Sequence, residues 1–440
     1  FERLQFMDQN KLNKAIEFHK VHNFDSAKLL YEEIISEDDT HYLPFFYLGA
    51  LELDLRNYLG AIKYLELSLD KNPNNVHTYI NLGAAYYELK DYQNCKKYYE
   101  QGTKINQNIE LLQNLATVYK DTGDINKAIN VYKKIYNDSP EDLKAAYWLH
   151  SLKALELDKG LKKKIKLILK NKNSSYTNKL FGNMLLSKYA NKASLYKDEL
   201  KFILNFHNVV YDYNKSRFET RKQFIFNELK NVTQYFDRSI TINGNETIRE
   251  SIKPIFIISH PRTGSTLVEK LITYNQDNLF PGEEACICSI IGDEFLKDKN
   301  FNSKLDEISN TIINKYQSAK LISKKEKINF TDKSTDSVYY LGWIKSIFPN
   351  AKFINCTRDP RASIVSILRN NLGSQSWAHK INDIIKYIDD FYYLIDYWQK
   401  EHQIEIYNFK YEDLINDFEN ESKKLLDFCS LKWSKNIKNF

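Results

Sequence analysis

A repeat in the first 140 residues constrains the fold of this chain more than any other feature. The pair Leu48-Gly49 recurs as Leu82-Gly83 and then as Leu115-Ala116, at steps of 34 and 33 residues. A small residue and a large apolar or aromatic residue recur at similar steps, namely Ala27, Ala61, Cys95 and Ala128, and Tyr31, Leu65, Tyr99 and Tyr132. Small residues let two antiparallel helices approach closely, and large ones fill the space between repeats. Residues 1–140 are therefore predicted to form an α-solenoid of four units.

These steps and residue types are those of the tetratricopeptide repeat. Turn-prone residues lie where the two helices of a unit would meet, at Asn57-Tyr58, Asp91-Tyr92 and Gly123-Asp124. Arrays of this kind usually bind a partner along a concave face, but they can also serve as scaffolds. We expect the repeats to bind a protein or peptide acceptor, and scaffolding is the alternative.

The rest of the chain divides into a helical continuation and a second domain. Residues 141–253 keep a helical pattern without the repeat, and Asp237–Lys253 is polar and turn-prone, which predicts a linker. Ile255–Ile258 is a short apolar run typical of a strand buried on both faces. Further helical stretches and apolar runs alternate at 265–274, 351–356, 361–371, 382–400 and 404–409. This alternation predicts an α/β domain with a mainly parallel sheet over residues 254–440.

Composition and charge exclude several classes of protein. The net charge of +6 is small for 440 residues and both signs are interspersed, so neither nucleic-acid nor membrane binding is indicated. No apolar run has the length of a membrane span and the N-terminus lacks a signal-peptide pattern, so we expect a cytoplasmic protein. The chain does not begin with Met, which suggests a fragment. Five irregularly spaced cysteines predict reduced thiols, and no metal site is expected.

The first segment with chemical meaning is Ser259–Leu267, which follows the first predicted strand and opens a helix. Gly264 permits close approach to the backbone, and Arg262 supplies a cation. Three hydroxyl groups are also available, from Thr263, Ser265 and Thr266. Because free N–H groups at a helix start attract anions, this segment is predicted to cradle a phosphate or sulfate group, with a plain capped helix start as the alternative. It lacks the Gly-Lys of a Walker A loop, which argues against a P-loop nucleotide kinase.

The second segment, Cys356–Pro360, follows the next apolar run. Its Arg358 would lie at a strand end, where α/β sheets place ligand contacts. Ser366 lies eight residues further on, about two turns into the following helix. A guanidinium group and a hydroxyl group in this arrangement suit a terminal phosphate. A structural ion pair within Arg-Asp-Pro is the alternative.

Two further segments carry candidate catalytic side chains. Pro281–Glu284 places the acids Glu283 and Glu284 in a loop after the first crossover helix. Close to an anion cradle, one of these acids becomes a candidate general base, although paired acids in a loop are most often only solvated. Lys333, which ends the segment Thr331-Asp332-Lys333, is a candidate cation for a transferred group.

These segments together resemble the tetratricopeptide-repeat sulfotransferases and, more distantly, the tyrosylprotein sulfotransferases. Pro261–Leu267 is similar to the 5′-phosphosulfate loop of that family, and Cys356–Pro360 with Ser366 is similar to its 3′-phosphate motif. Gly282-Glu283-Glu284 is similar to the segment that carries the family's catalytic base. Further similar segments are 348–352, 410–414 and 425–429. The resemblance in the second domain implies a P-loop-like sulfotransferase fold over 254–440.

The resemblance implies 3′-phosphoadenosine 5′-phosphosulfate (PAPS) as the co-substrate, without a metal. Arg262 and its loop would hold the 5′-phosphosulfate, and Arg358 and Ser366 would hold the 3′-phosphate. Lys333 would lie near the transferred sulfuryl group. The acceptor would be a hydroxyl group, and the tyrosine of a protein or peptide, a small phenol, a glycan and a lipid all fit.

The resemblance leaves two questions open. Glu284 matches the position of the catalytic base best, and Glu283 is the alternative. Members of the family continue beyond the position of Phe440, and the missing stretch helps to close the nucleotide site. The alternative to an active enzyme is therefore a decayed, non-catalytic sulfotransferase domain that carries a repeat-based protein-interaction module.

Overall fold

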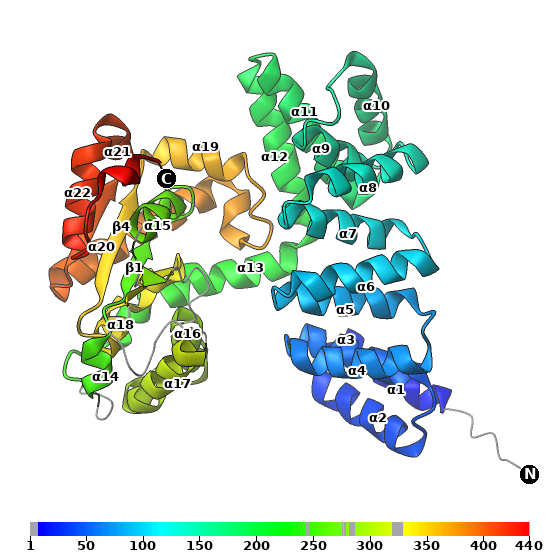
Figure 1. Cartoon of the computed structure of the whole chain (residues 1–440), viewed down its shortest axis with the longest axis horizontal. Coiled ribbons are helices and arrows are strands. Elements are labelled where there is room, and N and C mark those ends of the chain that lie inside the picture. Colours follow the sequence, from blue (N-terminus) through cyan, green and yellow to red (C-terminus); the bar gives the residue numbers. More distant parts are fainter. Residues whose placement is uncertain are drawn as a thin grey trace, which may run out of the picture. The chain divides into compact units, whose positions relative to one another are not determined.

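The computed structural model consists of two compact units, Phe1–Phe202 and Ile203–Phe440 (Figure 1). The structure describes residues 8–240, 242, 246–274, 276, 279–280, 287–318 and 329–439. Paired helices build the first unit, and a parallel sheet lies at the centre of the second.

The first unit contains the helix pairs that the repeat predicts. These pairs are α1 (Gln9–Lys20) with α2 (Phe24–Glu37), α3 (Tyr42–Asp54) with α4 (Tyr58–Lys71), α5 (Val76–Glu88) with α6 (Tyr92–Ile105), and α7 (Ile109–Asp121) with α8 (Ile125–Asp138). The recurring small and large residues are buried, which confirms the repeat. The closest approach is at Gly83, where a Cβ atom would lie 2.1 Å from Cε1 of Tyr99. A side chain at this position would therefore force the two helices apart.

The turn-prone residues between paired helices begin the second helix of each pair. Oδ1 of Asn57 accepts a hydrogen bond from the backbone N–H of Gly60 at 3.2 Å, and Oδ1 of Asp91 accepts one from Asn94 at 3.1 Å. These caps satisfy N–H groups that have no partner within the helix. The array continues as α9 (Leu143–Ser151), α10 (Lys159–Lys170) and α11 (Tyr176–Lys192), and α12 (Tyr196–Tyr213) passes from the first unit into the second.

The second unit is built around a sheet in which every described strand pair is parallel, as the alternation of strands and helices predicts. The strands are β1 (Ile255–Ile258), β2 (Leu279–Phe280), β3 (Asn329–Lys333), β4 (Lys352–Thr357) and β5 (Ile406–Lys410). Their order across the sheet is β2-β3-β1-β4-β5. β1 thus lies in the middle, with β3 and β2 on one side and β4 and β5 on the other.

The helices of the second unit cover both faces of the sheet (Figure 1). They are α13 (Lys215–Gln223), α14 (Glu246–Ser251), α15 (Ser265–Thr273), α16 (Ile287–Lys297), α17 (Leu305–Ser318), α18 (Leu341–Ile347), α19 (Pro360–Leu368), α20 (Ile381–Glu401), α21 (Tyr411–Asn416) and α22 (Phe418–Phe428). Short π or 3₁₀ turns lie at Phe224–Glu228, Leu229–Tyr235, Phe301–Lys304, Asp336–Tyr340, Ser376–His379 and Lys435–Asn439.

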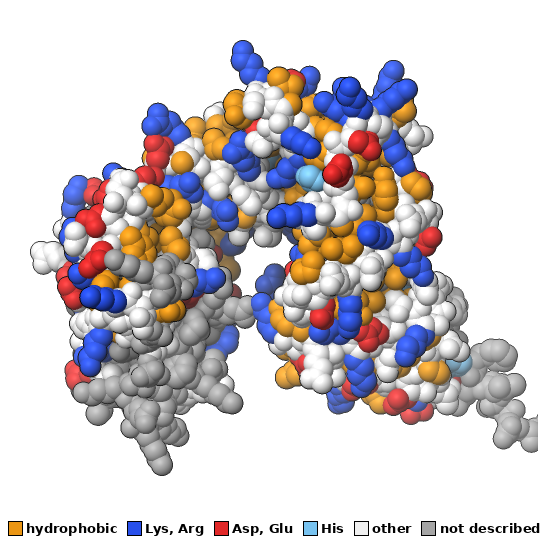
Figure 2. Space-filling view, turned by 45° about the horizontal axis from the view of Figure 1, so that its top comes forward, with side chains coloured by type: hydrophobic (Ala, Val, Ile, Leu, Met, Phe, Trp, Pro, Cys, Tyr) orange, Lys and Arg blue, Asp and Glu red, His pale blue; other side chains and the backbone are white. Residues whose placement is uncertain are grey.

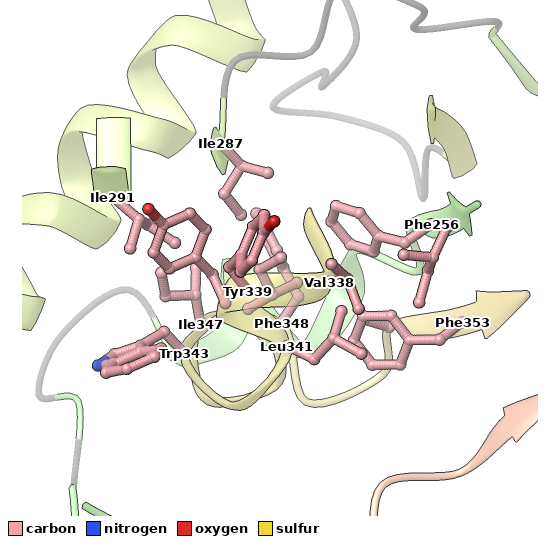
Figure 3. Packing of buried hydrophobic residues seen from close by; sticks show 14 of the residues in the cluster. Phe256, Ile287, Ile291, Val338, Tyr339, Leu341, Trp343, Ile347, Phe348 and Phe353 are labelled. Atoms are coloured by element: carbon pink, nitrogen blue, oxygen red, sulfur yellow. The ribbon is translucent and has the colours of Figure 1, made fainter. Parts of the chain in front are cut away.

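Alternate residues of β1 enter different hydrophobic cores. Phe256 and Ile258 pack in a cluster with residues of α16, α17, α18 and α20. Figure 3 shows part of this cluster, including Phe256 of β1 and Phe353 of β4. Ile255 and Ile257 pack in a second cluster with residues of α15 and α22. Both faces of β1 are therefore buried, which explains its continuous apolar run.

The segment predicted as a turn-rich linker differs from that prediction, because Glu246–Ser251 forms the short helix α14. The guanidinium group of Arg249 is buried and donates to the carbonyl oxygens of Ile242 at 2.8 Å and Ser346 at 3.2 Å. These contacts anchor the helix to a distant part of the chain. The local sequence is polar and carries no signal of them.

Candidate functional site

Four neighbouring strands end at one edge of the sheet. Because β3, β1, β4 and β5 are parallel, their carboxyl ends share the edge at which open α/β sheets bind ligands. Lys333 is the last residue of β3, the loop 259–264 follows β1, Arg358 follows β4 and Tyr411 follows β5. The fold thus gathers segments that the sequence analysis identified separately.

The loop after β1 turns sharply into α15. Gly264 has a φ of +96°, and a Cβ atom there would lie 2.7 Å from Cδ2 of Tyr411, so glycine is required. Arg262 also has a positive φ, +75°, which is unfavourable for a residue with a side chain. Within the described residues, no side chain caps the N-terminus of α15. The first N–H groups of this helix are therefore available to an anion.

Two arginines join this loop to the neighbouring strand and helix. The side chain of Arg262 reaches α19, where its Nε donates to Oγ of Ser366 at 3.0 Å. Nη1 of Arg358 donates to the backbone carbonyl oxygen of Arg262 at 3.3 Å, and its guanidinium group lies over the ring of Tyr411, 4.9 Å from the centroid. The predicted 5′ and 3′ halves of the nucleotide site are therefore adjacent.

The acid next to Arg358 does not neutralise it. Asp359 pairs with Arg361, whose Nη2 lies 2.8 Å from Oδ2, and its carboxylate also accepts the N–H groups that begin α19. The hydrogen bond from the Arg361 side chain lowers the pKa of Asp359 to about 2. In the part of the chain that the structure describes, Arg358 has no carboxylate partner. Its charge is therefore free to meet a ligand.

Lys333 contacts the start of α15 from the end of β3. Its Nζ donates to Oγ1 of Thr266 at 3.1 Å and lies 3.0 Å from Oε2 of Glu269. Oε1 of Glu269 accepts a hydrogen bond from Oγ1 of Thr331 at 2.9 Å. The side chains of Lys333 and Glu269 are only 10% and 6% exposed, so this is a buried ion pair at the floor of the site. Glu269 therefore fixes the position of the Lys333 ammonium group.

The residue before Lys333 is a fully buried acid. The hydroxyl group of Tyr316 donates to Oδ2 of Asp332 at 2.8 Å, whereas Oδ1 has no hydrogen-bond partner among the described residues. Burial raises the pKa of Asp332 to about 8, so this carboxyl group is protonated at neutral pH. Asp332 therefore does not supply a negative charge beside Lys333.

Buried hydrogen bonds support the loop from below. Oγ1 of Thr263 donates to the carbonyl oxygen of His260 at 3.1 Å, so this hydroxyl group closes the loop. Nε2 of His260 lies 3.3 Å from the hydroxyl oxygen of Tyr392 on α20. Burial lowers the pKa of His260 to about 4, so the imidazole is neutral at pH 7. The positive charge at the loop therefore comes from arginine and lysine.

The structure thus brings together Arg262, Gly264, Thr266, Lys333, Arg358 and Ser366, and Ser265 begins α15 beside them. Glu283 and Glu284 lie outside the described residues, so their position remains a prediction. The sequence analysis missed two residues. Glu269 lies one helical turn after Thr266, on the same side of the predicted helix, and Tyr411 follows the last predicted strand. Those two placements are the signals that could have identified them.

Within the described residues, no group of three or more His, Cys, Asp or Glu side chains could hold a metal ion. None of the described helices combines the length and the apolar character that crossing a membrane requires. The described cysteines, Cys95, Cys288, Cys356 and Cys429, are free thiols.

Comparison with protein families matches both parts of the chain. Residues 254–435 match the model of the Sulfotransferase family, and residues 76–109 and 109–137 match the tetratricopeptide repeat. An uncharacterized protein of Aquifex aeolicus (strain VF5) is 26% identical over 214 residues, which are 42% of this chain and 26% of that protein. Photosystem I assembly protein Ycf3 of Prochlorococcus marinus (strain NATL2A) is 32% identical over 86 residues, which are 19% of this chain and 49% of that protein. The chain therefore spans less than half of the length of these curated relatives.

Solved structures are similar over part of the chain. PilF of Pseudomonas aeruginosa has a TM-score of 0.37 and 13% identity, and the match covers 46% of this chain and 90% of that one. A crystal structure of MamA has a TM-score of 0.30 and 14% identity, and the match covers 47% of this chain and 92% of that one.

Proposed function

We propose that this chain, which joins tetratricopeptide repeats to a domain of the sulfotransferase family, transfers the sulfuryl group of PAPS to an acceptor hydroxyl group. The observation that carries the proposal is the contact between the two predicted anion sites. Arg262 and Ser366 are joined by a hydrogen bond of 3.0 Å, and Arg358 binds the backbone of Arg262. A nucleotide with phosphate groups on both its 3′ and 5′ positions presents two anions to such a pair of sites.

The residues of the site divide between the two anions. The 3′-phosphate is suited by Arg358 and by Ser366 on α19. Arg358 has no carboxylate partner in the described part of the chain. Arg262, Thr266 and the uncapped start of α15 suit the 5′-phosphosulfate. A nucleotide bound in this way would compete with Arg262 for the hydroxyl group of Ser366. Arg262 would then be released to bind the 5′ group.

The chemistry that these residues support is an in-line displacement at sulfur. Charge spreads over the non-bridging oxygens of the transferred group, and donors held in place before the reaction stabilise that charge. Lys333 is held in this way by Glu269 and Thr266. A sulfuryl group carries less charge than a phosphoryl group, so arginine, lysine and helix N–H groups match it well.

The proton of the acceptor hydroxyl group requires a base. By resemblance to the family, Glu284 is the proposed base and Glu283 the alternative. We expect Glu284→Gln to reduce turnover strongly and to leave nucleotide binding nearly unchanged, since a general base contributes about 10²–10⁴ in rate. The matched variant Glu283→Gln tests the alternative, because the residue whose replacement lowers turnover at unchanged affinity is the base.

The repeats are proposed to bind the acceptor or another protein. The anion-binding residues all follow residue 254, whereas the first unit offers an extended helical surface of the kind that binds chains through many weak contacts. A protein or peptide hydroxyl group, including that of tyrosine, is therefore the proposed acceptor.

The test is transfer of radiolabelled sulfate from PAPS by the purified full chain to a cell extract, to synthetic tyrosine peptides and to a small phenol. The proposal would be supported by label in the protein fraction, provided that replacement of Arg262 or Lys333 abolishes this labelling. Binding of 3′,5′-bisphosphoadenosine without transfer to any acceptor would instead support a non-catalytic interaction protein. Absence of nucleotide binding would reject both.

A further inference from the structure

Helix α10 carries a concentration of positive charge that nothing in the proposed function uses. Its twelve residues include six lysines, Lys159, Lys162, Lys163, Lys164, Lys166 and Lys170, and no acidic residue. The net charge of the whole 440-residue chain is also +6, so the remainder of the chain is neutral overall. Lys and Arg side chains gather over this end of the array at the upper right of Figure 2. The net charge of this one helix thus equals that of the whole chain.

Five of these lysines surround an open hollow. The hollow has a volume of about 380 Å³, and it is lined by Leu167 and by Lys159, Lys162, Lys163, Lys166 and Lys170. Lys159, Lys163, Lys166 and Lys170 follow one another at helical spacings of three or four residues, so they form a row along one face. In the described part of the chain, none of them forms an ion pair with a carboxylate. Like charges at these spacings destabilise a helix, and an anionic partner would relieve that repulsion.

We propose that the lysine face, defined as Lys159, Lys162, Lys163, Lys166 and Lys170, is a docking surface for an acidic segment of a partner protein. Charge complementarity identifies the partner as anionic. The row covers about 16 Å, the length of a short peptide segment with several Asp and Glu side chains. The inference does not depend on the proposed transferase activity.

The composition of the lysine face argues against the other common polyanions. It contains no aromatic residue on which the bases of a single-stranded nucleic acid could stack, and no arginine for bidentate contacts with phosphate. A helix that lies on a membrane inserts its apolar face, but Leu161 and Ile165 of α10 are buried among residues of α9 and α11. Leu167, at 62% exposure, is the exposed large apolar residue of the helix. A single apolar side chain is too small an apolar face to insert into a membrane. An acidic peptide needs neither feature.

The test is the binding of a fluorescent peptide of about twelve residues rich in Asp and Glu to the full chain, measured by anisotropy at low and at physiological salt. We expect the triple variant Lys163→Gln, Lys166→Gln, Lys170→Gln to bind at least about tenfold more weakly than the wild type, and the wild-type affinity to fall as salt rises. The control variant Lys20→Gln, Lys63→Gln, Lys133→Gln has the same net charge but alters exposed lysines of α1, α4 and α8. It should bind like the wild type.

A second variant, Lys163→Arg, Lys166→Arg, Lys170→Arg, keeps the charge and should keep the affinity, which excludes loss of fold as the cause. Circular dichroism melting of all variants checks this directly. Equal weakening in the control variant would overturn the proposal, because net charge and not the lysine face would then bind the peptide. Tighter binding of a single-stranded oligonucleotide or of phosphatidylserine vesicles than of the peptide would overturn it as well.

Discussion

Replacing Glu269 with Gln tests the arrangement at the floor of the site, because this one change removes the charge that holds Lys333. The carboxylate of Glu269 accepts from two donors, Nζ of Lys333 at 3.0 Å and Oγ1 of Thr331 at 2.9 Å. Gln has nearly the same shape but only one oxygen, so it can accept from one of the two. The substitution therefore removes one of these two buried contacts, together with the negative charge that Glu269 places beside Lys333.

The size of the effect follows from burial. Removing one partner of a buried ion pair costs about 3–5 kcal/mol, and losing one charge-assisted hydrogen bond costs about 1.5–3 kcal/mol. Lys333 keeps its hydrogen bond to Thr266, which is exposed, so water can partly replace the lost carboxylate. We therefore expect Glu269→Gln to lower the free energy of unfolding of the second unit by about 2–3 kcal/mol. For a unit of this size, that corresponds to a fall in Tm of about 5–10 °C.

The assay is denaturant unfolding of the full chain followed by tryptophan fluorescence, since Trp343, Trp377 and Trp398 are all buried in the second unit. The matched control is Glu294→Gln, which breaks the Lys297–Glu294 pair on α16, where the lysine is 66% exposed. Exposed pairs contribute about 0–1 kcal/mol, so the control should unfold almost like the wild type.

Nucleotide binding separates this explanation from a general loss of fold. Glu269→Gln removes one negative charge from the site, so the affinity for the anionic 3′,5′-bisphosphoadenosine should stay constant or rise. Turnover should fall, because the Lys333 ammonium group loses the carboxylate that helps to position it. Unchanged stability of Glu269→Gln would show that the buried pair does not form. Reduced nucleotide affinity in a folded variant would show that Glu269 serves the nucleotide in another way.

Three further variants test other contacts. Arg358→Ala should weaken the binding of 3′,5′-bisphosphoadenosine by about ten- to a hundredfold and the binding of adenosine 5′-phosphate far less. Equal losses of affinity for the two nucleotides in a calorimetric titration would contradict a role of Arg358 at the 3′-phosphate. Gly264→Ala, at a φ of +96° and with a Cβ atom 2.7 Å from the ring of Tyr411, should destabilise the second unit by about 1–2 kcal/mol or more, and a melting temperature equal to that of the wild type would refute the close approach. The folded-state pKa of Asp332, about 8, lies above its unfolded value, so wild-type stability should fall as pH rises, by about 1.4 kcal/mol per pH unit. Asp332→Asn removes that dependence, so its advantage over the wild type should grow by about 2 kcal/mol between pH 6 and pH 7.5, and a constant difference would contradict the raised pKa.

Local patterns predicted much of the architecture. The repeat identified the paired helices because each unit uses the same small and large residues at the same helical positions, and these residues are buried in the structure. Ile255–Ile258 was predicted as a strand with the bounds that the structure shows, because a strand buried on both faces needs a continuous apolar run. The strand that ends before Arg358 was predicted within one residue of β4.

The strand β3 shows where local patterns are insufficient. Its residues Thr331 and Asp332 are polar yet buried, and Phe330 is the one apolar residue of the segment Asn329–Lys333, which therefore lacks the apolar run of a buried strand. Thr331 donates to Glu269 of α15, and Oδ2 of Asp332 accepts from Tyr316 of α17, and both partners are distant in the sequence. The sequence of the β3 segment itself therefore does not identify these partners.

The sequence by itself determined which residues were available at the candidate site: the loop after β1, Arg358 with Ser366 at their spacing, and Lys333. Each is a local signal, since a loop between a strand and a helix is defined by neighbouring residues. The tertiary structure alone decided their relations. It paired Lys333 with Glu269, and it placed Arg358 against the backbone of Arg262 and the ring of Tyr411. The physical reason is that hydrogen bonds, burial and counter-charges depend on distances in space, and the parallel order of the strands sets those distances.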